Sequence, residues 1–188
     1  MIVMVISSIL AGCGAPAPVE VVDRGPLPAD SVYALDVALE DDSGETVALG
    51  QHRGHPTLIS MFYANCPMAC PTLIGDVRAL EDSLPEAVRE DLRVLLVSLD
   101  PERDTPALMR GVISDHDIDA DRWSLTRPPP ERLREIAAVL GVRYRPLSDG
   151  EMSHSSIVTL LDRDGRKLQT IEGLNQDASL IVNQVLAL

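Results

Sequence analysis

The stretch TLISMFYANCPMACPTLIGDVRAL, residues 57–80, contains the elements that decide the fold. Residues 57–63 form a continuous apolar run of the length of a buried strand, and residues 93–99, RVLLVSL, form a second one. Between the two runs, apolar residues recur at helical spacing from Pro71, whose fixed φ suits a first helical position, to just before Pro85. The stretch therefore predicts a strand, a helix and a second, parallel strand.

The segments on either side of this unit predict the rest of one α/β domain. Upstream, alternating residues around a turn that contains Gly44 are typical of a β-hairpin. Downstream, capping residues and apolar spacing predict further helices, and a turn joins two strand-like segments. The expected elements are a hairpin over 33–39 and 46–49, helices that begin at Pro106, at Pro130 and after Asp177, and strands over 156–161 and 167–172. This order is typical of a thioredoxin-like three-layer fold, here with an N-terminal β-hairpin extension.

The composition indicates a folded chain and excludes one class of partner. Of the 188 residues, 45% are hydrophobic and 24% are charged, which is the balance of a globular protein. Sixteen lysines and arginines against 29 aspartates and glutamates leave a net charge of −13. Because contacts with phosphates need clustered cations, we expect no nucleic-acid partner. A single domain is expected to span residues 32–188.

The N-terminus resembles the signal of a bacterial lipoprotein. An almost wholly apolar run ends in Leu10-Ala11-Gly12-Cys13, a small-residue cleavage pattern followed by a cysteine. The run is too short for a membrane-spanning helix, which needs about 20 apolar residues. We therefore expect residues 1–12 to be a signal peptide, Cys13 to carry a lipid, and the proline-rich residues 13–31 to tether the domain. The domain would then lie outside the cytoplasm, anchored to a bacterial membrane.

The other two cysteines, Cys66 and Cys70, lie in the loop between the first predicted strand and its helix. Pro71 disfavours a helical conformation at Cys70, which we therefore expect to be the N-cap. The positive end of the helix favours anionic sulfur, which lowers the thiol pKa and raises metal affinity. Three intervening residues leave more room for both sulfurs to face one ion than two residues would. A redox pair and a metal site both remain open, whereas a structural disulfide across so small a loop would add little stability.

A metal site in this loop would need a further donor. Two thiolates are soft ligands that suit Cu(I), and an imidazole can complete the coordination. His52, His55 and His116 lie in polar segments, where we expect solvated surface positions. His154 instead falls just before the predicted strand at 156–161, which in a thioredoxin-like fold enters beside the first helix. We therefore expect the imidazole of His154 to approach both sulfurs.

Parts of the sequence resemble the signature motifs of the SCO/SenC family of copper-binding assembly proteins. They are FYANCPMACP at 62–71, VSLDPERDTP at 97–106 and the pair His154-Ser155. The resemblance implies a domain that binds one copper ion through Cys66, Cys70 and His154. It also implies a role in assembling the dinuclear copper centre of cytochrome c oxidase. The expected partners are then a copper-accepting oxidase subunit, a copper donor and a thiol reductant outside the cytoplasm.

Four further side chains near these motifs are assigned less specific roles. Asp100 and Asp104 match the aspartate-rich block of the family, where acidic groups could orient His154 or modulate copper release. Ordinary loop and helix capping explains Asp104 equally well. Met68 and Met152 flank the expected ligands, but methionines are more often packing residues than ligands, so we leave them out of the coordination sphere.

The same cysteines are also compatible with an enzyme. A membrane-anchored thiol–disulfide oxidoreductase could use Cys66 and Cys70 to reduce the cysteines of a copper-accepting subunit. Such proteins usually carry a cis-proline facing the active disulfide, and residues 151–155 contain no proline. A peroxiredoxin is disfavoured, because the proline and threonine that precede its reactive cysteine correspond here to Ile59 and Tyr63. The sequence therefore favours copper handling, with the oxidoreductase as the alternative.

Overall fold

The structure is a computed structural model of the chain, and it describes residues 24–66, 69–148 and 151–188. The expected signal peptide, the expected lipidation site Cys13 and the side chain of Met68 lie outside the described residues. No helix in the described segments is long and apolar enough to cross a membrane.

The described end of the expected tether, residues 24–31, lies against the domain. Arg53 donates hydrogen bonds from its guanidinium group to the carbonyl oxygens of Arg24 and Gly25, each at 2.8 Å. Asp30 forms an ion pair with Arg166 at 3.0 Å. This end of the segment is therefore attached to the domain by polar contacts.

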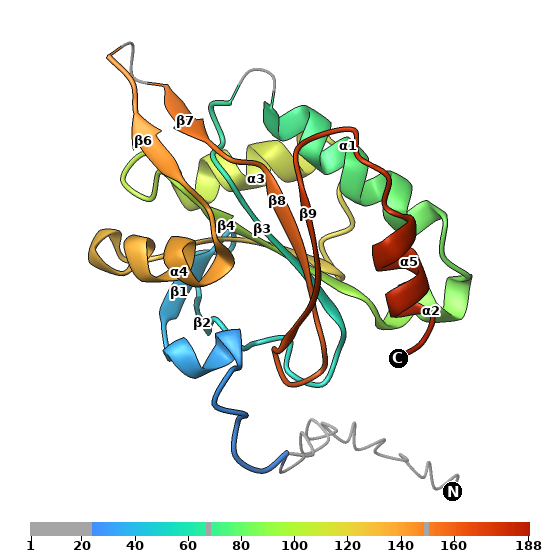
Figure 1. The fold of residues 1–188 in the computed structure, drawn as a ribbon. Helices are drawn as coiled ribbons and strands as arrows, with labels where there is room; N and C mark the ends of the chain where they lie inside the picture. The colour runs from blue at the N-terminus through green and yellow to red at the C-terminus, as the bar shows by residue number, and fades with distance from the viewer. Residues whose placement is uncertain (1–23, 67–68, 149–150) are drawn as a thin grey trace, which may run out of the picture.

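A seven-stranded mixed sheet forms the centre of the domain (Figure 1). The strands of the structure are β1 (Ala38–Asp41), β2 (Thr46–Ala48), β3 (Thr57–Phe62), β4 (Arg93–Ser98), β5 (Trp123–Arg127), β6 (Tyr144–Pro146), β7 (Met152–His154), β8 (Ile157–Leu161) and β9 (Lys167–Glu172). The sheet has the order β2-β1-β5-β4-β3-β8-β9, in which β3, β4 and β5 are parallel and the outer pairs are antiparallel. Strands β6 and β7 form a separate hairpin that projects beyond the sheet (Figure 1).

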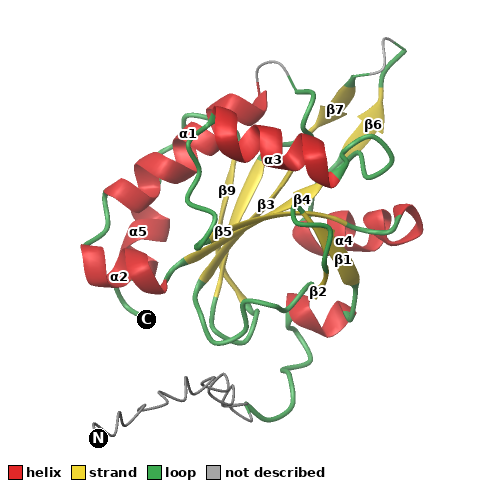
Figure 2. Ribbon diagram, turned by 180° about the vertical axis from the view of Figure 1, so that it is seen from behind, coloured by secondary structure: helices red, strands yellow, loops and turns green. Residues whose placement is uncertain are grey.

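Helices cover both faces of the sheet, so the domain has three layers (Figure 2). The helices are α1 (Ala69–Asp82), α2 (Glu86–Asp91), α3 (Pro106–Asp115), α4 (Leu133–Leu140) and α5 (Ser179–Val185), with short 3₁₀ helices η1 (Val32–Leu35) and η2 (Pro130–Arg132). Helices α1, α3 and α5 lie on one face, and α4 lies on the other with η1. The predicted three-layer thioredoxin-like architecture is confirmed. Strands β1 and β2 pair with each other as the predicted N-terminal hairpin, and β1 joins it to the sheet by pairing antiparallel with β5.

Two hydrophobic clusters, one on each face, hold the layers together. Successive side chains of a strand point to opposite faces, and β3 is buried along its whole length. Phe62 accordingly packs with Leu73 of α1, whereas its neighbour Met61 packs with Ile136 of α4. The continuous apolar runs seen in the sequence are therefore the central strands, whose two faces are both covered.

The segment before the N-terminal hairpin differs from the prediction of a strand over 33–39. Residues Val32–Leu35 form a 3₁₀ helix, and the strand begins only at Ala38. The hydroxyl of Ser31 caps this helix by accepting the N–H of Tyr33, whose own hydroxyl donates to Thr57 at 3.1 Å in the interior. A buried aromatic anchor thus overrides the alternation that suggested a strand.

Some elements of the described residues have no counterpart among those predicted. They are strand β5, the hairpin β6–β7 and the short helix α2. Strand β5 pairs with β4 over Val94 to Val97, and its Thr126 is fully buried with its hydroxyl donating to the carbonyl oxygen of Leu96 at 3.1 Å. Because the strand contains polar residues that are hydrogen-bonded inside the sheet, its sequence lacks the continuous apolar run by which a buried strand is recognised.

One acidic side chain is buried beneath the helical layer. Glu81, near the end of α1, is 3% exposed. Its carboxylate accepts hydrogen bonds from the guanidinium group of Arg122 at 2.5 Å and from the indole N–H of Trp123 at 2.9 Å. Burial raises the pKa of Glu81, while these two partners act in the opposite direction. The carboxylate therefore joins α1 to the start of β5.

Candidate metal centre

Residues from three separate segments bring two thiols and one imidazole together. Cys66 lies in the loop after β3, Cys70 lies in the first turn of α1, and His154 ends β7. The ligand atoms of the three residues all lie within 4.8 Å of one another. Among the described residues, this is the one group of histidine, cysteine and carboxylate side chains close enough to hold a metal ion. The expected approach of His154 to both sulfurs is confirmed.

Helix α1 begins earlier than predicted, so Cys70 is not its N-cap. The helix begins at Ala69, which makes Cys70 its second residue and Pro71 its third. The backbone N–H of Cys70 donates to Sγ of Cys66 at 3.3 Å. The first N–H groups of a helix have no partner inside it, and here a sulfur takes the place of a capping oxygen, while Pro71 has no N–H to satisfy. The helix start therefore fixes the two sulfurs next to each other.

Cys70 is held against the end of β3. Its Sγ donates to the carbonyl oxygen of Tyr63 at 3.3 Å and accepts the N–H of the same residue at 3.4 Å. Neither cysteine is part of a disulfide, and Cys70 is only 4% exposed. Burial raises the pKa of Cys70 above its ordinary value, so the expectation that the helix start lowers it is wrong for this thiol. Metal binding here has to release the thiol proton.

The imidazole of His154 is oriented by its neighbour in the chain. Nδ1 lies 3.2 Å from the carbonyl oxygen of Ser155. Because a carbonyl oxygen only accepts hydrogen bonds, Nδ1 carries the proton and Nε2 keeps its lone pair. Burial lowers the pKa of His154, which favours the neutral ring. A neutral imidazole with one nitrogen bound to a backbone carbonyl is the usual form of a metal-binding histidine.

Tyr63 links the cysteine loop to the β6–β7 hairpin, a role that the sequence reasoning missed. Its ring meets the His154 imidazole edge-on, with centroids 5.7 Å apart and planes at 82°. Burial, followed by the influence of the neighbouring Cys66, raises the pKa of Tyr63 to about 12, and the backbone of Met152 acts in the opposite direction. The signal in the sequence is a hydroxyl-bearing aromatic residue at the end of a buried strand, directly before the cysteine loop.

Asp104 holds the cysteine loop against the end of β4. Its fully buried carboxylate accepts the backbone N–H of Ala64 at 3.1 Å and the hydroxyl of Ser98 at 2.5 Å. Burial raises the pKa of Asp104, and the hydrogen bond from Ser98 opposes that effect. Asp100, at the other end of the same turn, forms an ion pair with Arg103 at 2.5 Å. Asp104 therefore acts on the loop that carries Cys66.

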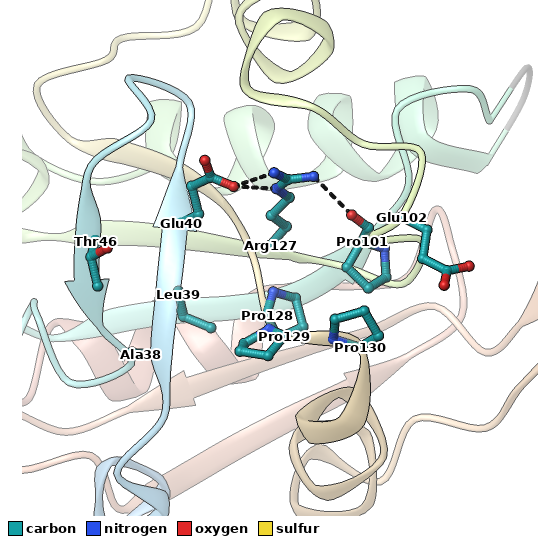
Figure 3. Close-up of a pocket in the computed structure, with 10 residues that line it drawn as sticks. All are labelled: Ala38, Leu39, Glu40, Thr46, Pro101, Glu102, Arg127, Pro128, Pro129 and Pro130. Atoms are coloured by element: carbon teal, nitrogen blue, oxygen red, sulfur yellow. Dashed lines mark hydrogen bonds and ion pairs between the residues drawn. The ribbon is translucent and has the colours of Figure 1, made fainter.

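The turn between the two aspartates is fixed from the neighbouring strands (Figure 3). Arg127, at the end of β5, donates to the carbonyl oxygen of Pro101 at 3.0 Å and to the carboxylate of Glu40 in β1 at 2.5 Å. A cavity of about 450 Å³ opens beside this ion pair. It is bordered by none of the three donor residues, so it is separate from the metal centre.

The remaining histidines take no part in the donor group. His52 is half-buried, contrary to the expectation of a solvated position, and its Nε2 lies 3.1 Å from the hydroxyl of Ser124 in β5. Burial lowers the pKa of His52 to about 4. His55 pairs with Asp91 at 2.7 Å, and His116 lies at the C-terminal end of α3. The loop before β3 thus packs on the sheet instead of extending into solvent.

The donor set suits a soft ion of low coordination number. Thiolate sulfur and imidazole nitrogen are preferred by copper and zinc, whereas calcium and magnesium select oxygen. Metal–ligand bonds of about 2.0–2.3 Å require the ligand atoms to lie about 4 Å from one another. The present distances, all within 4.8 Å, would have to shorten only slightly for one ion to bind all three. The site therefore fits copper by its chemistry.

The family model described as SCO1/SenC matches residues 30–187. The chain belongs to the SCO1/SenC family. The resemblance drawn from the three sequence motifs is thereby confirmed.

Individual SCO1/SenC relatives are similar to this chain at moderate identity. A putative copper-binding protein of Stutzerimonas stutzeri is 29% identical over 131 residues, which are 68% of this chain and 63% of that protein. The chain thus matches less than two thirds of that relative's length. A SCO1 protein homolog of Bacillus subtilis (strain 168) is 25% identical over 138 residues, 72% of this chain and 71% of that protein.

Solved structures share the fold over most of the chain. The structure of Bradyrhizobium japonicum ScoI with copper bound superposes with a TM-score of 0.67 at 26% identity, covering 81% of this chain and 96% of that one. A putative electron transfer protein from Aquifex aeolicus VF5 gives a TM-score of 0.74 at 22% identity, covering 83% of this chain and 91% of that one. These similarities agree with the thioredoxin-like architecture described above.

Proposed function

We propose that this protein is a copper metallochaperone that binds one copper ion through Cys66, Cys70 and His154. The convergence of two thiols and an imidazole within 4.8 Å is the observation that carries the proposal. The hydrogen bond from Nδ1 of His154 to Ser155 supports it, since it leaves Nε2 free to bind the metal. The copper-binding relative from Stutzerimonas stutzeri and the copper-bound ScoI structure support copper as the ion.

We further propose that the copper is passed to cytochrome c oxidase, where the protein assists assembly of the dinuclear copper centre. Membership of the SCO1/SenC family supports this role. In our proposal, the lipid-modified Cys13 anchors the domain outside the cytoplasm, where a copper donor loads it and an oxidase subunit accepts the metal. Transfer would proceed by ligand exchange, in which a thiolate or thioether of the acceptor displaces one protein ligand from the ion.

Copper loading has to depend on the redox state of the two cysteines. A disulfide between Cys66 and Cys70 has no thiolate to offer, so a thiol reductant must first supply two electrons and two protons. The same chemistry defines the second candidate function, a thiol–disulfide oxidoreductase that reduces the cysteines of a copper-accepting subunit. The proximity of the two thiols, one in the loop after β3 and one at the start of α1, favours this alternative.

A paired measurement separates the two functions. The reduced and the oxidised protein are titrated with Cu(I) against a chelator of known affinity, and both are assayed for reduction of a model disulfide. A chaperone binds one copper per reduced chain and none per oxidised chain. If the reduced protein fails to retain copper while His154→Ala leaves disulfide turnover unchanged, the oxidoreductase is correct and the chaperone is not.

The bridge made by Tyr63 gives a further expectation for the copper site. Tyr63→Phe keeps the ring against His154 but removes the hydroxyl whose pKa responds to the neighbouring Cys66 and Met152. Because partners that only orient metal ligands typically contribute about 10–100-fold to affinity, we expect copper to bind about tenfold more weakly. A competition titration measures the change.

Tyr144→Phe is the matched control for this substitution. Tyr144 lies opposite His154 in the hairpin, is half-buried and is not part of the donor group. Loss of its hydroxyl should leave copper affinity unchanged. An equal weakening in both variants would show that the hydroxyl of Tyr63 has no particular role in the site.

A further inference from the structure

The β6–β7 hairpin, which carries His154, presents two different faces. In the hairpin, Tyr144 is paired with His154, and Arg145 is paired with Ser153. Paired residues lie on the same face and successive residues alternate, so Arg145 lies on the face opposite to that of His154. Arg143, which precedes β6 and is joined to Ser155 through a backbone hydrogen bond, continues the same alternation. The imidazole thus faces the thiols, while the two arginines are on the outer face of the hairpin.

The two arginines are exposed, and no carboxylate of the described residues pairs with them. Many other cations of the chain are neutralised by carboxylates, as Arg122 is by Glu81 and Arg163 is by Asp91. Within the described ranges, the guanidinium groups of Arg143 and Arg145 form no ion pair and no hydrogen bond, whereas the backbone N–H of Arg143 donates to the hydroxyl of Ser155 at 3.0 Å. A chain with a net charge of −13 therefore keeps two uncompensated positive charges beside its metal centre.

Polar side chains of this region border a depression in the protein surface. It has a volume of about 400 Å³ and is bordered by both arginines, by the hydroxyl-bearing Ser153 and Ser155, and by His154. Guanidinium groups match carboxylates with paired hydrogen bonds, and hydroxyl groups add further donors. The depression is therefore suited to carboxylate groups and borders an expected copper ligand.

We propose that the outer face of this hairpin, with Arg143 and Arg145, docks an acidic segment of a partner protein that exchanges copper with the centre. The inference rests on the proposed function, because it specifies the charge of the protein with which copper is exchanged. Because the chain has a net charge of −13, most of the protein repels an acidic partner, whereas the two arginines attract it. The electrostatic attraction therefore directs the partner to the hairpin that carries His154. Docking through these residues places the partner's own metal ligands next to the exchanging ion.

The test uses the metal-free protein, so its result does not depend on copper. A fluorescently labelled aspartate-rich peptide and its asparagine analogue are titrated with the reduced protein at low ionic strength, and anisotropy reports binding. The wild type should bind the acidic peptide about tenfold more tightly than the analogue, and added salt should remove the difference. Arg143→Glu combined with Arg145→Glu should abolish this preference.

Arg134→Glu is the matched control. Arg134 is exposed on α4 and makes no ion pair in the described part of the chain, so its reversal changes the net charge without changing the hairpin. The preference for the acidic peptide should survive in this variant. Equal loss in both variants, equal binding of the two peptides, or equally strong competition by citrate would each overturn the proposal.

Copper titrations on the same proteins keep the two proposals apart. The arginine variants should bind copper like the wild type, because neither arginine is in the donor group. A protein that binds the acidic peptide but not copper would overturn the chaperone and leave the docking surface standing. If the protein bound copper but showed no preference for the acidic peptide, the docking surface would be overturned and the chaperone would stand.

Discussion

Replacing Cys70 with serine is expected to weaken copper binding by more than about a hundredfold, since even residues that only orient a ligand contribute about 10–100-fold. The hydroxyl of serine is a hard donor and does not ionise as a thiol does when it meets a soft metal. The sulfur is also fixed in the first turn of α1, so no other described thiol can take its place beside Cys66. His154→Ala should cause a comparable loss. Competition against a Cu(I) chelator under reducing conditions measures both affinities.

The control for these substitutions is His116→Ala. His116 lies at the C-terminal end of α3, and its ring is outside the donor group. Copper affinity should be unchanged in this variant. Urea unfolding of the metal-free proteins checks that the variants fold. If correctly folded Cys70→Ser or His154→Ala bound copper with the affinity of the wild type, the proposed ligand set would be wrong.

Glu81→Ala is expected to lower the free energy of unfolding by about 1–3 kcal/mol, the usual cost of leaving a buried donor without an acceptor, because Asp119 still pairs with Arg122 at 2.8 Å. The substitution leaves the guanidinium group of Arg122 and the indole N–H of Trp123 without their shared acceptor. It also leaves a hole in a site that is 3% exposed. Equilibrium unfolding in urea, with the thiols kept reduced, measures the effect as a lower midpoint.

Glu86→Ala provides the comparison for a pair at the surface. Glu86 forms an ion pair with Arg89 within α2, and its side chain is 69% exposed. Exposed pairs of this kind contribute about 0–1 kcal/mol, so the midpoint should hardly move. A shift of similar size in both variants would mean that burial does not distinguish the carboxylate of Glu81.

The sequence predicted the centre of the fold because the physical cause is local there. Strands β3 and β4 are buried on both faces, so each is a continuous apolar run in the sequence. The apolar residues between them recur at the spacing of a helix and not of a strand. Strand β5 was missed because Ser124 and Thr126 interrupt its apolar pattern, and the partners of these polar groups lie elsewhere in the chain. The 3₁₀ helix at Val32–Leu35 was missed for the same reason, because it depends on a hydrogen bond from Tyr33 to the distant Thr57.

The three donors of the metal centre were predictable for a different reason. Cys66 and Cys70 are separated by only three residues, and His154 could be placed beside them once the order of strands was known. The orientation of the imidazole, the bridge from Tyr63 and the raised pKa of Cys70 were not predictable. Each of these results from packing between distant segments, and the Cys70 result shows that burial can outweigh the charge at the end of a helix.

The order of the three donors along the chain affects when the site can exist. Both thiols leave the ribosome early, whereas the imidazole follows 154 − 70 = 84 residues after the second sulfur. A chain in the course of synthesis or export therefore offers only two of the three groups. If the three donors bind copper as proposed, an occupied site requires that β7 has already packed beside the start of α1, so binding depends on a contact between segments made at different times.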